Sequence, residues 1–202
     1  MLEKVREIFK KEATAIENIP VTKSFEVAIE IILRQVHEKN GKLVTSGMGK
    51  AGQIAHNIAT TFSSTGTPSI FLHPSEAQHG DLGILQENDV LLAISNSGKT
   101  REIIELIDLK NNLYPQIPVI VITGNENGPL ALKADSYILT GSPEEVCTLG
   151  LTPTTSTTMM TVIGDALVVL LMDKIGFSAK DYAKRHHGGY LGMKSREISG
   201  KE

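Results

Sequence analysis

The run Ser95-Asn96-Ser97-Gly98-Lys99-Thr100 has the side chains of a phosphate-binding turn. An apolar run precedes it and a helical pattern follows it, so its hydroxyl groups lie beside the free N–H groups and partial positive charge of a helix start. Gly98 lets the backbone approach an anion closely. A plain helix cap explains any one of these hydroxyls equally well, but several in one turn favour phosphate. The pattern Gly-x-x-x-x-Gly-Lys-[Ser/Thr] is absent, so this is not a Walker loop.

Two other polar turns lead into predicted helices. Pro153-Thr154-Thr155-Ser156-Thr157-Thr158 is rich in hydroxyls, of which capping explains one or two. Beside the first turn it is a candidate second arm of the same anion site, with Thr154, Ser156 and Thr157 as donors. Ser46-Gly47-Met48-Gly49-Lys50 carries a Gly-x-Gly pair, which is a weak nucleotide signal because the dinucleotide fingerprint is not met. Lys50 is a candidate cation or an ordinary first-turn helix residue.

Histidine and carboxylate side chains are the usual general acids and bases near neutral pH, and here they fall in four clusters. The clusters are the stretch from His73 to Asp81, which includes His79; Glu102 with Glu105; Glu144 with Glu145; and His186 with His187. Each has a structural alternative, since a carboxylate in the first turn of a helix, for example, suits the helix dipole. No tight His or Cys spacing predicts a metal site. The single cysteine, Cys147, is expected to be a small core residue.

The apolar pattern predicts helices over the first forty residues and then alternating strands and helices. The strands are expected at residues 42–46, 68–72, 90–95, 118–123 and 136–139, and the later helices at 50–63, 100–113, 129–134, 157–174 and 179–184. Residues 73–83 fit neither period. Because the strands are apolar runs rather than alternating patterns, we expect an α/β fold, a three-layer α-β-α sandwich around a five-stranded parallel sheet. Ligands of such sheets bind beyond the carboxyl ends of the strands, where the polar turns fall.

Length and composition narrow the class of protein. The 202 residues suggest one domain, and 41% apolar with 21% charged residues is an ordinary soluble balance. A net charge of −3 does not favour nucleic acid or an acidic membrane as a partner. We find no secretory signal and no run of 18 apolar residues, and with one cysteine we expect a cytoplasmic protein. Trp is absent and aromatics are 4%, so a sugar ligand would be held by hydrogen bonds and its phosphate.

Together these stretches resemble the SIS (sugar isomerase) domain family, and among its members the isomerase domain of the D-arabinose-5-phosphate isomerases. The resemblance covers nearly the whole chain. It rests on the turns at residues 46–52 and 95–100 and on three further stretches: His73-Pro74-Ser75-Glu76-Ala77-Gln78-His79-Gly80-Asp81-Leu82-Gly83, Leu149-Gly150-Leu151-Thr152-Pro153-Thr154-Thr155-Ser156-Thr157-Thr158 and Gly164-Asp165-Ala166-Leu167. It implies one flavodoxin-like SIS domain over residues 1–202 with a helical segment over about 1–40. The pair of CBS modules that many members carry lies outside this sequence, so regulation stays open. His187 departs from the proline usual in the family.

The resemblance implies interconversion of D-ribulose 5-phosphate and D-arabinose 5-phosphate, which supplies 3-deoxy-D-manno-octulosonic acid (Kdo) for lipopolysaccharide. It further implies a homotetramer with shared active sites, no cofactor, no metal, and a possible role for a Kdo-related feedback ligand. Active-site positions that match are Lys50, His79, Glu102, Glu145 and His186. Substrate-binding positions that match are Ser46, Gly47, Ser95, Asn96, Ser97 and Thr100, with Thr154, Ser156 and Thr157 in support.

An aldose–ketose isomerisation needs a base for the C–H proton and a donor or cation for the enediolate oxygen. Glu145 or Glu102 is expected to transfer the C–H proton, and His186 to act in ring opening or oxygen proton transfer. His79 is expected to polarise an oxygen, and Lys50 to stabilise charge. Two alternatives remain: another SIS isomerase acting on a hexulose or sedoheptulose phosphate, and a non-catalytic phosphosugar sensor. A DNA-reading regulator is disfavoured because no basic helix-turn-helix region precedes the domain.

Overall fold

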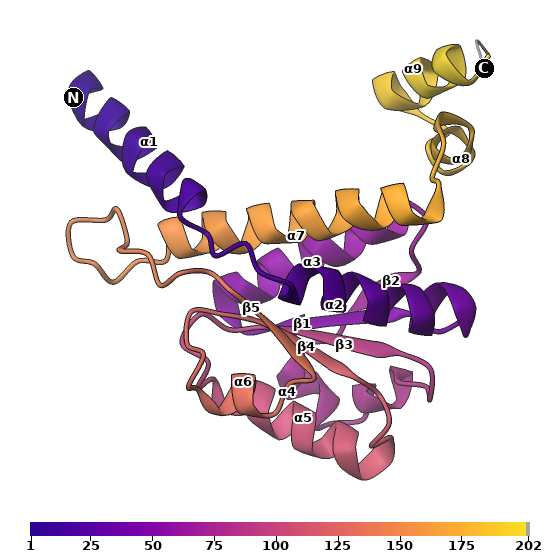
Figure 1. Ribbon diagram of the computed structural model, residues 1–202, viewed down its shortest axis with the longest axis horizontal. Helices are drawn as coiled ribbons and strands as arrows, with labels where there is room; N and C mark the ends of the chain where they lie inside the picture. The colour runs from indigo at the N-terminus through magenta and orange to yellow at the C-terminus, as the bar shows by residue number, and fades with distance from the viewer. Residues whose placement is uncertain (201–202) are drawn as a thin grey trace.

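The computed structural model describes residues 1–200 and consists of a parallel sheet between two layers of helices (Figure 1). The strands are β1 (Leu43–Gly47), β2 (Ser69–Phe71), β3 (Val90–Ile94), β4 (Val119–Thr123) and β5 (Ser136–Leu139). They pair in the order β2-β1-β3-β4-β5 and all pairs are parallel. The predicted five-stranded parallel sheet is therefore confirmed, with the strand order of flavodoxin-like folds.

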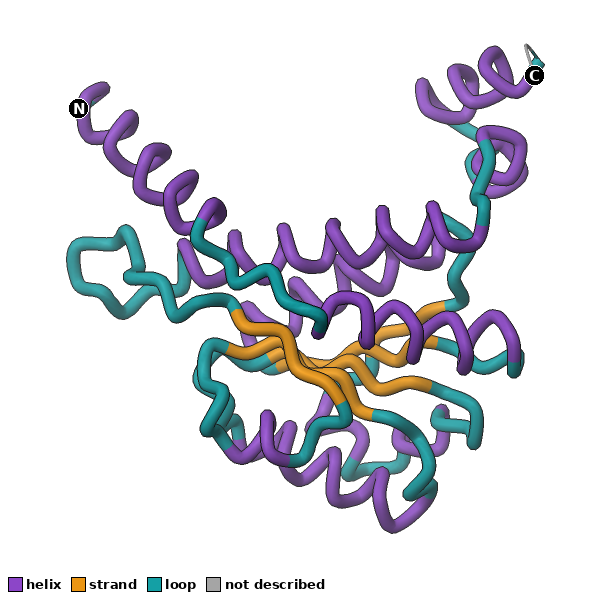
Figure 2. Tube along the Cα trace, in the orientation of Figure 1, coloured by secondary structure: helices purple, strands orange, loops and turns teal. Residues whose placement is uncertain are grey.

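The helices cover both faces of the sheet (Figures 1 and 2). One layer contains α2 (Ser24–Ile32) with its continuation η1 (Leu33–Glu38), α3 (Gly49–Ser64) and α7 (Thr155–Ile175); the other contains α4 (Pro74–Ala77), α5 (Arg101–Leu113) and α6 (Pro129–Leu132). β3 contributes side chains to two hydrophobic cores, one on each face of the sheet. Leu92 and Ile94 pack toward α3 and α7, whereas Leu91 and Ala93 pack toward α5. Successive side chains of a strand point to opposite faces, which is why a strand buried on both sides is a continuous apolar run.

Two helical segments leave this body on the side of α7. α1 (Leu2–Glu17) projects at one end, and α8 (Ala179–Arg185) with α9 (Gly189–Ser199) projects at the other (Figure 2). No residue of α1 is buried, and its apolar residues Val5 and Phe9 are exposed. α9 was not predicted, and the sequence interpretation that His186 follows the last helix is wrong, because α9 comes after it.

The long helix α7 is apolar enough along its length to pass for a membrane span by composition. Half of that stretch is buried inside the protein, where Ile163 and Leu167 pack on the sheet. α7 is therefore a core helix with one outward apolar face that includes Val169 and Leu170.

Residues 73–83 also differ from the sequence prediction, which left them irregular. The chain instead makes two short helical turns, α4 and η2 (Asp81–Ile84). Pro74 opens α4, and buried Ala77 fixes it against α5. Neither turn is long enough to show a helical repeat in the sequence.

Candidate active site

The turn from Ser95 to Thr100 lies at the carboxyl end of β3 and opens α5 as predicted. The Ser95 side chain is buried, and its hydroxyl lies 2.7 Å from the Thr100 hydroxyl and 3.4 Å from that of Ser97. Thr100 occupies the N-cap position but makes no side-chain cap bond to α5. The alternative that these residues serve as a helix cap therefore does not describe this turn. The Ser95, Ser97 and Thr100 hydroxyls lie near one another, and the N–H groups at the start of α5 remain available to an anion.

Neighbouring strand ends hold this turn in place. The Asn96 Oδ1 atom accepts a hydrogen bond from the Thr140 hydroxyl at 2.9 Å, and the Asn96 carbonyl accepts one from the Gly124 N–H at 2.9 Å. The Asn125 side-chain amide donates to the Ser97 carbonyl at 3.1 Å. Asn96 thus links the loops after β3, β4 and β5, which is a bracing role that the sequence did not reveal.

The turn after β1 carries Ser46, Gly47 and Lys50. The buried Ser46 hydroxyl donates to the Leu72 carbonyl at 2.7 Å, which ties β1 to the end of β2. A Cβ atom at Gly47 would lie 2.7 Å from the Ala51 carbonyl oxygen, so the close turn into α3 needs glycine. Lys50 is exposed in the first turn of α3, on the same edge of the sheet as the Ser95 turn.

His79 and Glu102 lie on neighbouring elements at this edge. His79 is exposed between α4 and η2. Glu102 is partly buried in the first turn of α5, two residues after Thr100. The side-chain amide of Gln78 donates to a Glu105 carboxylate oxygen at 2.8 Å, which links the His79 segment to α5.

Glu145 lies in the loop between β5 and α7, and its carboxylate caps the start of α7. One oxygen accepts from the Thr154 N–H at 2.6 Å, from the Thr154 hydroxyl at 2.9 Å and from the Ser156 N–H at 3.4 Å. The other accepts from the Ser156 hydroxyl. Partial burial raises the pKa of Glu145, but these hydrogen bonds together outweigh it and hold the pKa below its ordinary value of 4.5. The predicted second anion arm is thus filled, in this structure, by a carboxylate of the chain itself; Thr157 donates its hydroxyl to the Thr154 carbonyl.

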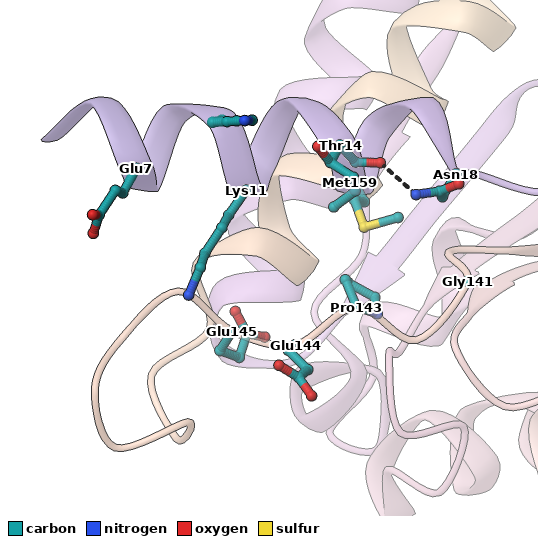
Figure 3. A pocket seen from close by; sticks show the side chains of 11 residues that line it. Glu7, Lys11, Thr14, Asn18, Gly141, Pro143, Glu144, Glu145 and Met159 are labelled. Atoms are coloured by element: carbon teal, nitrogen blue, oxygen red, sulfur yellow. Dashed lines mark hydrogen bonds between the residues drawn. The ribbon is translucent and has the colours of Figure 1, made fainter. Parts of the chain in front are cut away.

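Two cavities flank the Glu145 loop. One of about 530 Å³ lies between the loop and α1 and is lined in part by Lys10, Lys11, Asn18 and Glu144 (Figure 3). The other, of about 590 Å³, is lined in part by Asn96, Glu144, Glu145 and the residues from Cys147 to Leu151. The loop is therefore a wall that separates the Ser95 turn from α1.

Cys147 belongs to this wall, and the expectation that it is a core residue is wrong. It is partly exposed, and its Sγ atom accepts a hydrogen bond from the Thr152 N–H at 3.2 Å. Backbone hydrogen bonds, that of Thr152 first, lower the pKa of the thiol below its ordinary value of 9.0.

His186 is far from the other candidates within one chain. It ends α8, where its ring stacks on Tyr182 with ring centroids 3.7 Å apart and Nδ1 lies 3.0 Å from the Tyr182 carbonyl oxygen. α8 follows the carboxyl end of α7 (Figure 1). The Glu145 carboxylate accepts hydrogen bonds at the opposite end, from Thr154 and Ser156. The 21 residues of α7 span about 31 Å at 1.5 Å per residue. A single chain therefore brings together Lys50, His79, Glu102 and the Ser95 turn at one edge of the sheet, but not His186.

Comparison with known proteins shows which family the chain belongs to. Residues 36–170 match the model of the SIS domain. The chain is 51% identical over 154 residues to the arabinose 5-phosphate isomerase KdsD of Shigella flexneri, which covers 76% of this chain and 46% of that protein. The chain thus spans about half the length of the curated relatives it matches.

Two solved structures have the same fold over nearly their whole length. One, from Bacteroides fragilis and named for a phosphosugar isomerase involved in capsule formation, is 67% identical with a TM-score of 0.93, covering 94% of this chain and 99% of that one. The other, E. coli CFT073 c3406 in complex with arabinose 5-phosphate, is 33% identical with a TM-score of 0.85, covering 92% of this chain and 96% of that one.

Proposed function

The chain belongs to the SIS domain family, and on this premise we propose that it interconverts D-ribulose 5-phosphate and D-arabinose 5-phosphate. The observation that carries the proposal is the Ser95 turn, where the Thr100 hydroxyl turns to Ser95 instead of capping α5. Hydroxyls and free helix N–H groups then converge on one point, as a phosphate monoester requires. The KdsD relatives and the c3406 complex with arabinose 5-phosphate support this choice of substrate.

In the proposed reaction the substrate phosphate binds Ser95, Ser97 and Thr100. A carboxylate, Glu102 or Glu145, takes a proton from C1 of the ketose and leaves an enediolate. The same proton, or one from solvent, is then added to C2. A hydrogen is lost from the O1 hydroxyl and one is gained by O2, so that C1 becomes the carbonyl carbon. These steps convert ketose to aldose with no net oxidation, and no cofactor is needed for the electron balance.

Oxygen chemistry needs donors near O1 and O2. We assign His79 to polarisation of the carbonyl oxygen and Lys50 to the negative charge of the enediolate. His186 is assigned to ring opening or oxygen proton transfer. Asn96 supports the site by holding the turn, through its bonds to Thr140 and Gly124.

The position of His186 leads to a proposal about assembly. Because α8 lies at the far end of α7 from the Ser95 turn, His186 reaches a site only if a second copy supplies it. The unburied α1 and the apolar residues of α9, Tyr190 and Leu191 among them, provide surfaces for a homotetramer with shared sites. Mixing inactive Lys50→Ala and His186→Ala subunits tests this, since hybrid oligomers regain complete sites; no recovered turnover after verified hybrid formation would argue against sharing.

The proposed biological setting is the cytoplasm, where the product would supply Kdo and lipopolysaccharide synthesis, as the naming of the KdsD relatives suggests. A Kdo-related compound is then a reasonable feedback ligand to test by titration against turnover.

The direct test of function is incubation of the purified chain with D-ribulose 5-phosphate in deuterated water, followed by NMR. We expect arabinose 5-phosphate with deuterium at C2. Thr100→Val removes one hydroxyl at constant shape and should raise KM, whereas Thr100→Ser should restore it. No turnover across pentose, hexose and heptose phosphates, with phosphosugar binding retained, would favour the sensor alternative; turnover of another sugar phosphate would favour a different SIS isomerase.

A further inference from the structure

The contacts of Glu145 distinguish it from the other carboxylate that could act as the base. Four donors, the N–H and hydroxyl groups of Thr154 and Ser156, point at its two oxygens. An ionised carboxylate offers about four acceptor positions, so this side chain is saturated. It also lies at the positive end of the α7 dipole, which stabilises its charge.

These contacts fix a long loop. Between β5 and α7 the chain runs through residues 140–154 without a helix or strand. Glu145 attaches the middle of this loop to the first turn of α7, and the neighbouring Val146 N–H donates to the Thr155 hydroxyl at 3.2 Å. The loop lines the same cavity as Asn96, which braces the Ser95 turn. Loss of the Glu145 attachment would therefore loosen a wall of the substrate site.

The same contacts make Glu145 a poor proton acceptor. Each hydrogen bond favours the ionised form, and the result is a lowered pKa. A general base works best with a pKa near the working pH, and protonation of Glu145 would require these bonds to be lost or rearranged.

Glu102 has the opposite surroundings. It is partly buried, stands two residues after Thr100, and its carboxylate accepts no side-chain hydrogen bond within residues 1–200. Its oxygens are therefore available to C1 or C2 of a substrate whose phosphate is bound by the Ser95 turn.

We propose, on the basis of the isomerase function above, that Glu145 is a positioning residue that caps α7 and holds the 140–154 loop, and that Glu102 transfers the C–H proton. The two roles can be separated because each predicts a different response to loss of charge at constant shape.

The test compares Glu145→Gln, Glu102→Gln and Glu87→Gln in the full chain. Glu87 is the control, since it is exposed and lies just before β3, at the opposite edge of the sheet from the Ser95 turn. The measurements are exchange of the C1 hydrogen of D-ribulose 5-phosphate and of the C2 hydrogen of D-arabinose 5-phosphate with deuterated solvent, the pH profile of kcat/KM, and amide hydrogen exchange at the start of α7.

We expect Glu102→Gln to lose about 10²- to 10⁴-fold in carbon–hydrogen exchange and to lose the acidic limb of the pH profile. Glu145→Gln should keep that limb, raise KM more than it lowers kcat, and lose amide protection at Thr154 and Ser156, whose N–H groups donate to Glu145. Glu87→Gln should resemble the wild type in all three measurements.

Loss of exchange and of the acidic limb in Glu145→Gln, with both retained in Glu102→Gln, would overturn the assignment. Unchanged amide protection in Glu145→Gln would overturn the positioning role whatever the kinetics. A wild-type protein that exchanges no sugar-phosphate hydrogens would instead refute the isomerase function, while the amide measurement would still decide whether Glu145 caps α7.

Discussion

Gly98 offers a quantitative test of the Ser95 turn. Its φ angle is +65°, in the left-handed region, and a Cβ atom there would lie 2.9 Å from the Thr123 hydroxyl oxygen. That oxygen cannot move freely, because it accepts a hydrogen bond from the Asn125 N–H at 3.2 Å inside a buried residue. Gly98→Ala should therefore both strain the backbone and displace the end of β4.

The two costs can be estimated separately. A left-handed backbone costs an L-residue about 1–2 kcal/mol, and an overpacked contact costs about 1–3 kcal/mol. Gly176→Ala isolates the first cost, since Gly176 ends α7 at a φ of +62° with nothing near its Cβ position. Gly124→Ala isolates the second, since its φ is not positive and a Cβ would lie 2.8 Å from Asn96 Oδ1. Gly98→Ala should lower the free energy of unfolding by the sum, about 2–5 kcal/mol.

Urea unfolding of the three variants at one protein concentration measures these differences in free energy of unfolding. The KM for D-ribulose 5-phosphate shows whether the Ser95 turn still binds the substrate phosphate. We expect Gly98→Ala and Gly124→Ala to raise KM and Gly176→Ala to leave it unchanged. If Gly98→Ala is no less stable than Gly176→Ala, the close contact with Thr123 is not present and the described shape of the turn is wrong.

Three further predictions concern ionisable groups. Asp89 is fully buried and accepts hydrogen bonds from the Lys42 ammonium group at 2.6 Å and from two backbone N–H groups. Because Asp89→Ala leaves these donors without their acceptor, it should lower the free energy of unfolding by about 3 kcal/mol without changing KM. An unchanged urea midpoint would contradict this. Glu145 has a pKa below its unfolded value of 4.5, so its stabilisation is complete above that pH and is lost as the pH falls through the folded pKa. The stability difference between wild type and Glu145→Gln should then be constant near neutral pH and shrink in acid, and a difference that is the same at all pH values would refute it. The Cys147 thiol, with its lowered pKa, should react with iodoacetamide at about pH 7.5 faster in the folded chain than in urea; a slower folded-state rate would count against the Thr152 hydrogen bond.

The sheet could be predicted because its residues are buried on both sides. β3 and β4 are runs of five fully buried residues, and short apolar runs bounded by polar turns are typical of the central strands of a parallel sheet. The Ser95 turn followed from the same pattern, since a polar turn between a buried strand and a helix lies at the ligand-binding edge.

What could not be predicted depends on contacts between residues distant in sequence. The buried residues of α9 are the small Gly192 and Ser195, whereas Tyr190, Leu191 and Met193 are exposed, so the sequence shows no buried apolar face for this helix. The attachment of Glu145 to Ser156 joins a loop residue to a helix start 11 positions away, and no periodicity encodes it.

The distance between Glu145 and His186 is likewise hidden in sequence, because it depends on α7 being straight and unbroken. Only the structure places these two candidates at opposite ends of one helix (Figure 1).

That uninterrupted helix limits how the chain can change in length. One residue inserted within Thr155–Ile175 would turn everything beyond it by about 100° and advance it by about 1.5 Å. α8, α9 and His186 would then point in a new direction, even with every side chain of the sheet unchanged. A substitution on the outer face of α7 changes its surroundings locally, whereas an insertion or deletion there changes the position of α8 and α9 relative to the sheet. Variation in length should therefore be tolerated in the loops and selected against in α7.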